Sequence, residues 1–288
     1  MNYRALIENR KSVRAFTDKK VSMPELKELE LYFNRFARRL IPQIKTELMF
    51  FDDSSREALE GAAGYNQFLV GAPQYLVLLS QKHPQMHLNA GFLMEDLVLK
   101  ITDMGLSSCW LTFVDSEAVK EAIGVHTDLE VAALVAFGYG VKTTKRLRLN
   151  IRSMSDIDIS AKRHYVEPKR SIYDMVFLNS WGNVHKLDDH IGFFDDMLWE
   201  AFHAATLSPS YLNRQAYGFV IHDGFVSLVS RPDSYTTQLD GQLSLGIVLL
   251  HFTAAASDWA GALQWKLGEE AQNLKLPEGH KVIASCVL

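Results

Sequence analysis

Two long apolar segments, residues 88–104 and 241–263, restrict the possible folds of this chain more than any other sequence feature. Each has the length and continuity of a helix that is apolar around most of its circumference, and such a helix has to be buried on nearly all sides. A chain of 288 residues, 48% of them hydrophobic, can bury both in one large core or two ordinary ones. The second segment is apolar enough to resemble a membrane span, but His251 and Asp258 interrupt it. We therefore expect a buried central helix there and no membrane contact.

Shorter patterns predict the elements around these two helices. A capping box at Ser22 and Glu25 predicts a helix to about residue 40, and Gly105 is placed to end the first long helix. Asp223 and Gly224 lie between two apolar runs and predict a hairpin. Strands are expected at residues 75–79, 109–113, 131–137, 217–221, 225–229 and 282–287, and short helices at residues 116–123 and 193–207.

The chain divides near its middle. Residues 142–170 are rich in Lys, Arg, Ser and Asp, a composition typical of a connecting segment. The order of elements before and after it is similar, which predicts a first half at residues 1–150, a connecting segment at 151–168 and a second half at 169–288. Leu88, Leu99 and Thr102 align without gaps with Leu239, Leu250 and Thr253.

Several function classes find no support in the composition. A net charge of -4 argues against a broad nucleic-acid surface. The charged N-terminal residues lack the apolar core of a signal peptide, and Cys109 and Cys286 have no disulfide or zinc-ligand spacing, so we expect a cytoplasmic protein without a metal. No zinc-protease pattern, catalytic triad or Gly-rich phosphate loop is present.

Three polar clusters are the candidates for chemistry. Arg10, Lys11, Ser12 and Arg14 combine the charged donors that suit a phosphate, although a solvated basic turn has the same composition. The other two clusters each have a functional and a structural interpretation. One of them could bind the edge of a heteroaromatic ring or be an ordinary Ser-Pro turn, and it consists of Ser208, Pro209, Ser210, Asn213 and Gln215. The other could approach a flat ligand or be a helix C-cap before a buried Trp, and it consists of Gly105, Leu106, Ser107, Ser108, Cys109 and Trp110.

Together, the three clusters resemble the motifs of the nitroreductase family of FMN enzymes. Arg10, Ser12 and Arg14 match the family's Arg-x-Ser-x-Arg motif, which grips the FMN phosphate and ring edge. The other two motifs are Gly-Leu-x-x-Cys-Trp, which is matched throughout, and Pro-Ser-x-x-Asn-x-Gln-Pro-Trp, in which Ala216 and Tyr217 replace the last two residues. The matching positions are Gly105, Leu106, Cys109 and Trp110 for the former and Pro209, Ser210, Asn213 and Gln215 for the latter.

The resemblance implies an α+β fold with antiparallel-dominated sheets packed by helices. In the family's usual order the Asn-Gln motif lies between the other two, and an intertwined homodimer builds each FMN site from both subunits. Here that motif comes last, which implies a fused dimer: two related halves in one chain, plausibly monomeric, that share one site. Near Tyr173, and over Ser257, Asp258 and Trp259, the second half does not repeat the motifs, so we expect its own site to be lost.

The resemblance also implies the reaction and the cofactor contacts. NADH or NADPH would reduce FMN by hydride transfer, and a nitro-aromatic, quinone-like or similar electron-poor small molecule would then take the electrons, with no side chain assigned as a catalyst. Arg10, Ser12 and Arg14 are expected to hold the phosphate, and Ser208, Ser210 and Asn213 to contact the ring or ribityl chain. The full expected set is Arg10, Lys11, Ser12, Arg14, Gly105, Leu106, Ser107, Arg146, Ser208, Pro209, Ser210 and Asn213.

Two alternatives stay open at this point. The replaced Pro-Trp pair and the lost second site also suit a flavin-binding or degenerate nitroreductase-fold protein without turnover. A specialised reaction such as reductive dehalogenation would differ in substrate only, and loop residues that set the pocket do not distinguish it.

Overall fold

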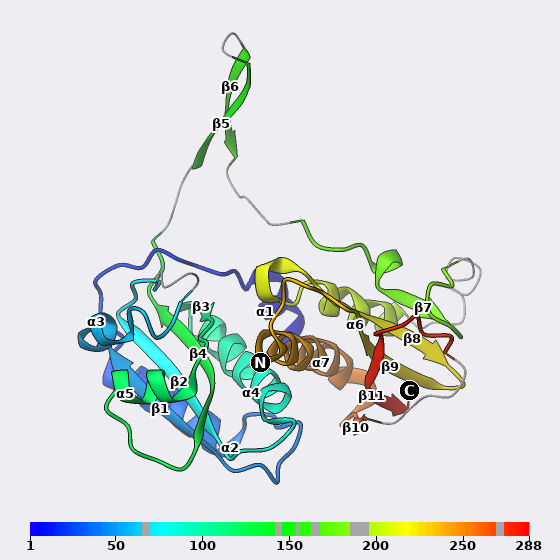
Figure 1. The fold of residues 1–288 in the computed structure, drawn as a ribbon, viewed down its shortest axis with the longest axis horizontal. Helices are drawn as coiled ribbons and strands as arrows, with labels where there is room; N and C mark the ends of the chain where they lie inside the picture. The colour runs from blue at the N-terminus through cyan, green and yellow to red at the C-terminus, as the bar shows by residue number, and fades with distance from the viewer. Residues whose placement is uncertain are drawn as a thin grey trace.

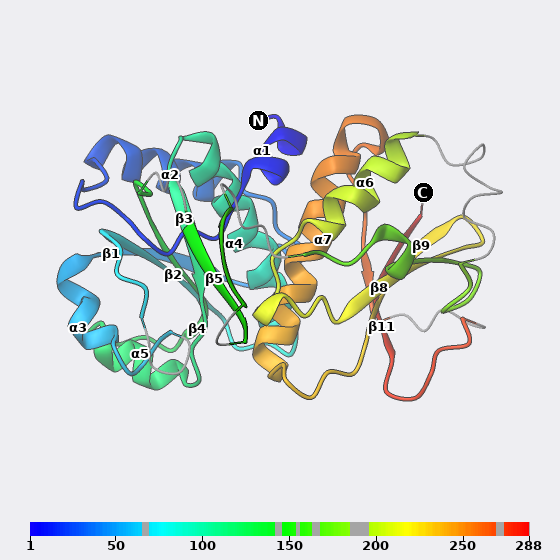
Figure 2. The same ribbon diagram turned by 90° about the horizontal axis from the view of Figure 1, so that it is seen from above.

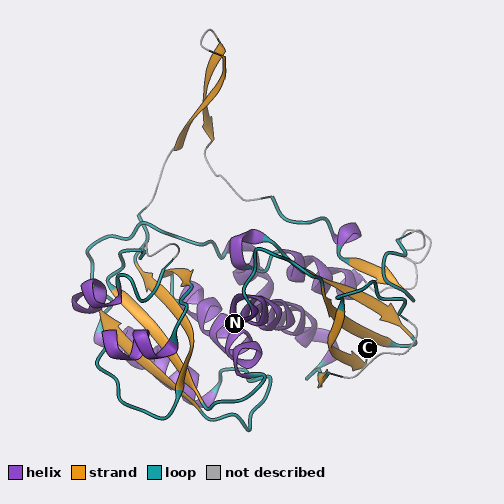
Figure 3. Ribbon diagram, viewed as in Figure 1, coloured by secondary structure: helices purple, strands orange, loops and turns teal. Residues whose placement is uncertain are grey.

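Two sheets flank a pair of long helices at the centre of the protein (Figures 1 and 2). This arrangement is seen in a computed structural model, which describes residues 1–64, 69–141, 146–153, 156–162, 168–184, 196–268 and 274–287. Over residues 146–153 and 156–162, and at residue 258, only the backbone is described. The strands are mostly antiparallel, which confirms the predicted α+β class (Figure 3).

The first sheet has four antiparallel strands in the order β1-β2-β4-β3. All seven residues of β2 are buried, and β4 carries eight buried residues in nine, as expected for continuous apolar runs. The sequence patterns did not predict β1. The strands are β1 (Thr46–Asp52), β2 (Gln74–Ser80), β3 (Ser107–Leu111) and β4 (Glu130–Gly138).

The second sheet has five strands in the order β10-β11-β9-β8-β7. The predicted hairpin between β8 and β9 is confirmed, with Asp223 and Gly224 both at positive φ, as a tight hairpin turn requires. β7 is parallel to β8 and was not predicted. The strands are β7 (Val176–Leu178), β8 (Tyr217–His222), β9 (Phe225–Ser230), β10 (Lys266–Leu267) and β11 (Lys281–Val287).

The helices cover the sheets and form the central pair. α4 packs on the first sheet, α7 packs on the second sheet together with α6, and α3 and α5 contribute to the apolar cluster on the other face of the first sheet. The α-helices are α1 (Tyr3–Asn9), α2 (Met23–Arg35), α3 (Arg56–Leu59), α4 (Met86–Asp103), α5 (Ser116–Ala122), α6 (Asp196–Thr206) and α7 (Gln238–Ala260). The 3-10 helices are η1 (Asp53–Ser55), η2 (Ile172–Asp174) and η3 (Tyr211–Asn213).

α4 and α7 are the two long apolar helices that the sequence predicts. Among the described residues, only α7 is long and apolar enough to span a membrane, but 78% of that stretch is buried inside the protein. The helices pack so closely that a Cβ added to Gly91 would lie 2.2 Å from the carbonyl oxygen of Leu243. Their apolar surface is therefore the core that joins the two sheets.

The two sheets repeat one strand order. Read from β3, the first sheet runs β3-β4-β2-β1, and read from β10, the second runs β10-β11-β9-β8 before the additional β7. The matching strands also follow one another in the same order along the chain. α4 lies between β2 and β3, and α7 lies between β9 and β10. The two sheets therefore share a strand order, as is expected for two related halves.

The helix contacts show which positions correspond between the halves. Gly91 contacts Leu243, and Gly246 contacts Leu88 in the same way, with a Cβ there 2.0 Å from the Leu88 oxygen. In a pair of helices related by a two-fold axis, each contact occurs twice with the two helices exchanged. Leu88 therefore corresponds to Leu243, and Gly91 to Gly246. The alignment of Leu88 with Leu239 is therefore wrong by one helical turn, because apolar positions that repeat every turn match equally well after such a shift.

The turn that follows α7 has a glycine at positive φ, like the turn that follows α4. α7 continues through Ala260, and Gly261 takes a positive φ there, as Gly105 does after α4. Trp265 then follows as Trp110 does in the first half. Ser257, Asp258 and Trp259 lie within α7 and form no such turn, as expected, and the turn begins at Gly261 instead.

A hairpin stands apart from both sheets. β5 (Arg146–Ser153) pairs antiparallel with β6 (Asp156–Lys162), and Figure 1 shows this hairpin extending away from the two halves. It lies within the basic stretch that the sequence analysis interprets as a connection.

Candidate functional site

The Arg-Ser-Arg segment lies along strand β3. Ser12 forms a β-bridge with Ser108, and the Val13 amide donates to the Ser108 oxygen at 2.9 Å. A Cβ on Gly140 would lie 2.6 Å from the Ser107 Oγ and 3.0 Å from Val13, so this glycine allows the close approach. The structure therefore brings the first and third sequence clusters together.

Two guanidinium groups lie close to this strand. Arg10 follows α1, its amide donating to the Leu6 oxygen at 2.8 Å, and its side chain is only 8% exposed, whereas Arg14 is exposed. Burial raises the pKa of Cys109, and the charges of Arg14 and Arg10 oppose that rise. Both cations thus act on the same segment of β3, while Lys11 and Ser12 beside them are exposed.

A buried carboxylate receives Arg10. The Arg10 Nε lies 3.6 Å from Glu95 Oε1, and this buried Nε has no hydrogen-bond partner among the described residues. Trp110 Nε1 donates to the other oxygen of Glu95 at 2.7 Å. On α7, His251 Nε2 lies 2.9 Å from Glu95 Oε1, and its Nδ1 lies 3.1 Å from the Ala204 carbonyl oxygen in α6.

Glu95 was not among the residues predicted from the sequence, and His251 was interpreted only as an interruption of an apolar helix. Both side chains are 0% exposed. An acidic residue and a histidine within two otherwise apolar helices were the available signal, because ionisable groups are rarely fully buried without partners.

The Ser208–Gln215 loop follows α6 and has a strained backbone. Leu212, Asn213 and Gln215 all have positive φ, which is uncommon for residues other than glycine. The Ser208 side chain is fully buried, donates to the Ala205 oxygen at 2.8 Å and pairs with the Tyr217 hydroxyl at 2.6 Å. The tyrosine that replaces the motif's tryptophan is thus part of the loop's hydrogen bonding.

Burial raises the pKa of the Tyr217 hydroxyl to about 12, while hydrogen bonds with Ser208 and Gln215 oppose the rise. Tyr217 is therefore a neutral partner of the buried Ser208 at ordinary pH.

The Asn213 amide is engaged within the protein. Its Oδ1 accepts from Lys169 Nζ at 2.6 Å, and its Nδ2 donates to the Pro168 oxygen at 2.8 Å. Gln215 accepts from the Arg170 amide at 2.8 Å. The expected contact between Asn213 and a ring edge would have to replace these bonds.

Lys169 and Arg170 are brought to this loop although they were not predicted as site residues. Lys169 Nζ also donates to the Ser208 oxygen at 2.8 Å. Burial and the charge of Arg170 lower the pKa of Arg231 to about 10, which places a third cation nearby. Residues 169–172, with the sequence Lys-Arg-Ser-Ile, weakly resemble residues 10–13, with the sequence Arg-Lys-Ser-Val, and this resemblance was the available sequence signal.

The remaining predicted contacts are distributed as follows. Gly105, at positive φ, and the buried Leu106 lead from α4 into β3 and so lie beside the Arg10 segment. Pro209 and Ser210 are partly buried, and Ser210 Oγ accepts from the Gln215 amide at 3.0 Å. Arg146 lies in β5, and its side chain is outside the described part of the structure.

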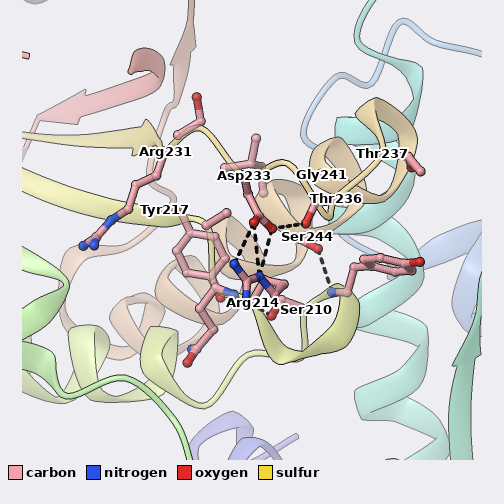
Figure 4. A pocket seen from close by; sticks show the side chains of 14 residues that line it. Ser210, Arg214, Tyr217, Arg231, Asp233, Thr236, Thr237, Gly241 and Ser244 are labelled. Atoms are coloured by element: carbon pink, nitrogen blue, oxygen red, sulfur yellow. Dashed lines mark hydrogen bonds and ion pairs between the residues drawn. The ribbon is translucent and has the colours of Figure 1, made fainter. Parts of the chain in front are cut away.

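Two small cavities border these elements. One lies between α1 and α6, the helices that precede Arg10 and Ser208 in the chain. Its lining residues include Arg4, Ile7, Ala204 and Leu207. The other lies on the far side of the loop, where Arg214 and Asp233 form a bidentate ion pair (Figure 4). Both, at about 150 and 110 Å³, are smaller than usual enclosed ligand sites.

The polar cluster is built on one side of the helix pair only. In the correspondence of α4 with α7, Glu95 matches Leu250 and Asp96 matches His251. Asp96 instead accepts from Tyr3, Tyr32 and the Arg38 amide. Among the described residues, no group of three His, Cys, Asp or Glu side chains is placed to hold a metal ion.

The α+β fold, with a basic segment against the strand after a central helix, defines a nitroreductase-like protein. A family model described as "Putative TM nitroreductase" matches residues 2–178, more than half of the chain. The chain belongs to this nitroreductase family, and membership supports an oxidoreductase function.

One solved structure shares the fold over the whole chain, and others match about half of it. A crystal structure from Thermotoga maritima, described as a "putative nitroreductase", is 19% identical and covers 100% of this chain and 94% of its own, with a TM-score of 0.59. Two Clostridium difficile structures, described as a nitroreductase family protein and an FMN-dependent nitroreductase, are 20% and 19% identical, with TM-scores of 0.41 and 0.39. They cover 50% and 47% of this chain and 87% and 86% of their own. A search of curated proteins found no match.

Proposed function

We propose that this chain is an FMN-dependent oxidoreductase that uses NADH or NADPH to reduce an electron-poor small molecule such as a nitro-aromatic compound or a quinone. The observation that carries the proposal is the pairing of the Arg10–Arg14 segment with β3 in a chain of the nitroreductase family. When bound, FMN would accept hydride from the nicotinamide and pass two electrons to the acceptor.

The residues of the first half fit the anionic end of this cofactor. Lys11, Ser12 and Arg14 are exposed beside β3 and combine an ammonium, a hydroxyl and a rigid guanidinium fork, the donors that hold phosphate oxygens. Arg10 is oriented by Glu95, and its buried Nε has no hydrogen-bond partner in the described part of the chain. We infer that Arg10 faces the ring edge and that Lys11, Ser12 and Arg14 hold the phosphate.

The loop of the second half contributes in a modified way. Because Lys169 and Pro168 occupy the Asn213 amide, we infer that Asn213 acts chiefly by holding Lys169, which adds a cation to this side of the site. Pro209 and Ser210 remain the proposed contacts of the ribityl chain and ring, and we infer that the buried Ser208 shapes the loop through its bonds with Ala205 and Tyr217. The packing of α1 against α6 supports this arrangement, because Arg10 follows the first of these helices and Ser208 the second.

We also infer that residues 1–150 and 169–288 act as the two halves of a pseudo-dimer in a monomeric chain. The repeated strand order supports this inference, as does β7, which lies within the family match and adds a strand to the second sheet. The buried free thiols of Cys109 and Cys286 suit the reducing cytoplasm.

The proposal is tested by purifying the protein, extracting and identifying its flavin, and adding NADH or NADPH without oxygen. Bleaching of the flavin absorption, followed by recovery on addition of a quinone, is the expected result. Protein that stays colourless and takes up no added FMN would contradict it. Protein that binds FMN but is not reduced by either nicotinamide would favour the alternative without turnover, which the replaced Pro-Trp pair motivates.

A further inference from the structure

The buried pair Glu95 and His251 joins the two halves beside Arg10. Glu95 is on α4, His251 is on α7, and both are 0% exposed with 2.9 Å between Oε1 and Nε2. The close contact of the two helices at Gly91 and Gly246 holds the pair at hydrogen-bond distance. Any charge on these groups is therefore held in the core, where water screens it weakly.

The partners of His251 determine how many protons its ring carries. Nδ1 lies 3.1 Å from the Ala204 carbonyl oxygen, which can only accept, so Nδ1 carries a hydrogen. Nε2 faces Glu95, so the second proton of the pair lies on either Nε2 or the carboxyl group. A neutral histidine opposite an ionised carboxylate would leave two acceptors facing each other.

The partners of Glu95 favour the proton on histidine. Trp110 donates to its Oε2 at 2.7 Å, and the Arg10 cation lies 3.6 Å from its Oε1. A donated hydrogen bond and a nearby positive charge both favour an ionised carboxylate. Nε2 then has to donate, and His251 is an imidazolium.

The cluster therefore carries a net positive charge. Arg10 and His251 contribute two cations and Glu95 one anion. Two further ionisable groups interact with these charges. Burial raises the pKa of Cys109, and the charge of Arg10 opposes that rise. Burial also raises the pKa of Tyr217, and the charge of Glu95 adds to that rise. Both are neutral near pH 7. Because an unbalanced buried charge is costly, the cluster favours an anion next to Arg10.

We propose that His251 is a positioning residue that stays protonated and, through Glu95 and Arg10, favours the added negative charge of reduced FMN over oxidised FMN. The proposal rests on the function proposed above, since it assumes FMN beside Arg10. Charge near the flavin ring is a means by which a protein tunes its affinity for electrons. The corresponding positions, Leu250 and Asp96, form no such pair, so the effect belongs to one side of the helix pair.

The protonation state is tested without the cofactor. Nitrogen-15 NMR of histidine-labelled protein, with His251 assigned from the spectrum of H251Q, reports whether each ring nitrogen carries a hydrogen. We expect both His251 ring nitrogens to carry a hydrogen at pH 7, as their partners on Ala204 and Glu95 require. An unprotonated nitrogen of His251 at pH 7 would overturn the proposal.

The effect on the cofactor is tested by measuring the ratio of reduced to oxidised FMN affinity through equilibrium with a redox dye. H251Q keeps hydrogen-bonding groups but removes a positive charge, so the ratio should fall about tenfold, and E95Q, which removes a negative charge, should raise it. If His251 and Glu95 had only a structural role, the affinity ratio would change in the same direction in both variants. H203Q is the matched control and should leave the ratio unchanged.

The outcomes separate the two proposals. Shifts of the same sign, or no shift in folded H251Q, would overturn the role of His251 while leaving the proposed function intact. Failure of the unsubstituted protein to bind FMN would instead overturn the proposed function, and the NMR result would still report the charge of His251.

Discussion

Gly91 in α4 and Gly246 in α7 make matching contacts across the helix pair at the centre of the protein. A Cβ on Gly91 would lie 2.2 Å from the Leu243 oxygen, and one on Gly246 would lie 2.0 Å from the Leu88 oxygen. Both distances are shorter than any ordinary contact, and both involve rigid backbone. The two halves can therefore approach this closely only because neither position has a side chain.

Substitution of either glycine should destabilise the whole chain. Gly91→Ala or Gly246→Ala would push the helices apart, at a cost of at least about 1–3 kcal/mol in the free energy of unfolding, measured by urea titration. Gly241→Ala is the matched control, because its Cβ would only contact Thr236 at 3.6 Å. That variant should be neutral or stabilised by about 0.5–1 kcal/mol, as expected for alanine within a helix. Equal stability of all three variants would show that the helices are not in this contact.

Removal of the guanidinium groups should weaken FMN binding. Arg10→Ala and Arg14→Ala should each reduce affinity about tenfold to a hundredfold, since a hydrogen bond to a charged group contributes about 1.5–3 kcal/mol. Arg35→Ala, at an exposed position on α2, removes the same charge elsewhere and should have little effect. Fluorescence titration with FMN measures the three variants. Unchanged affinity in the first two would remove these residues from the proposed site.

One FMN should bind per chain. Arg10, Glu95 and Trp110 form a polar cluster on one side of the helix pair, whereas Leu250 takes the place of Glu95 on the other. Extracted flavin measured against protein concentration gives the ratio directly. Two flavins per chain would show that the second half keeps a working site.

The buried Tyr217 should make stability depend on alkaline pH. Its pKa is raised to about 12 in the folded protein, while an unfolded tyrosine titrates near pH 10. The neutral form is thus favoured by folding, and this contribution is complete below about pH 10 and is lost as pH rises toward 12. Tyr217→Phe should lower stability by about 1 kcal/mol at pH 8, through loss of the Ser208 bond, and reduce the decline above pH 10.

The control for this prediction is Tyr235→Phe. Tyr235 is 67% exposed, so its removal should leave the alkaline decline as it is. Urea midpoints at pH 8, 10 and 11 compare both variants with the unsubstituted protein. An unaltered decline in Tyr217→Phe would mean that Tyr217 does not titrate above its ordinary value.

Local patterns in the sequence were sufficient for the long elements and for the family. The apolar continuity of β2, β4, α4 and α7, and the Asp223-Gly224 turn, are properties of neighbouring residues, and all are confirmed. The family resemblance rests on three short motifs and is confirmed over residues 2–178. The half-buried β1 and the short β7 and β10 lack such a pattern, and their pairing partners stabilise them.

Contacts between distant segments depended on how the helices and sheets pack. Glu95 and His251 are 156 positions apart, and nothing local indicates that one faces the other. The correspondence of Gly91 with Gly246, and the engagement of Asn213 by Lys169, likewise follow from packing. Helical periodicity repeats every turn and so leaves the axial register open, whereas close packing permits only the register in which the backbones fit.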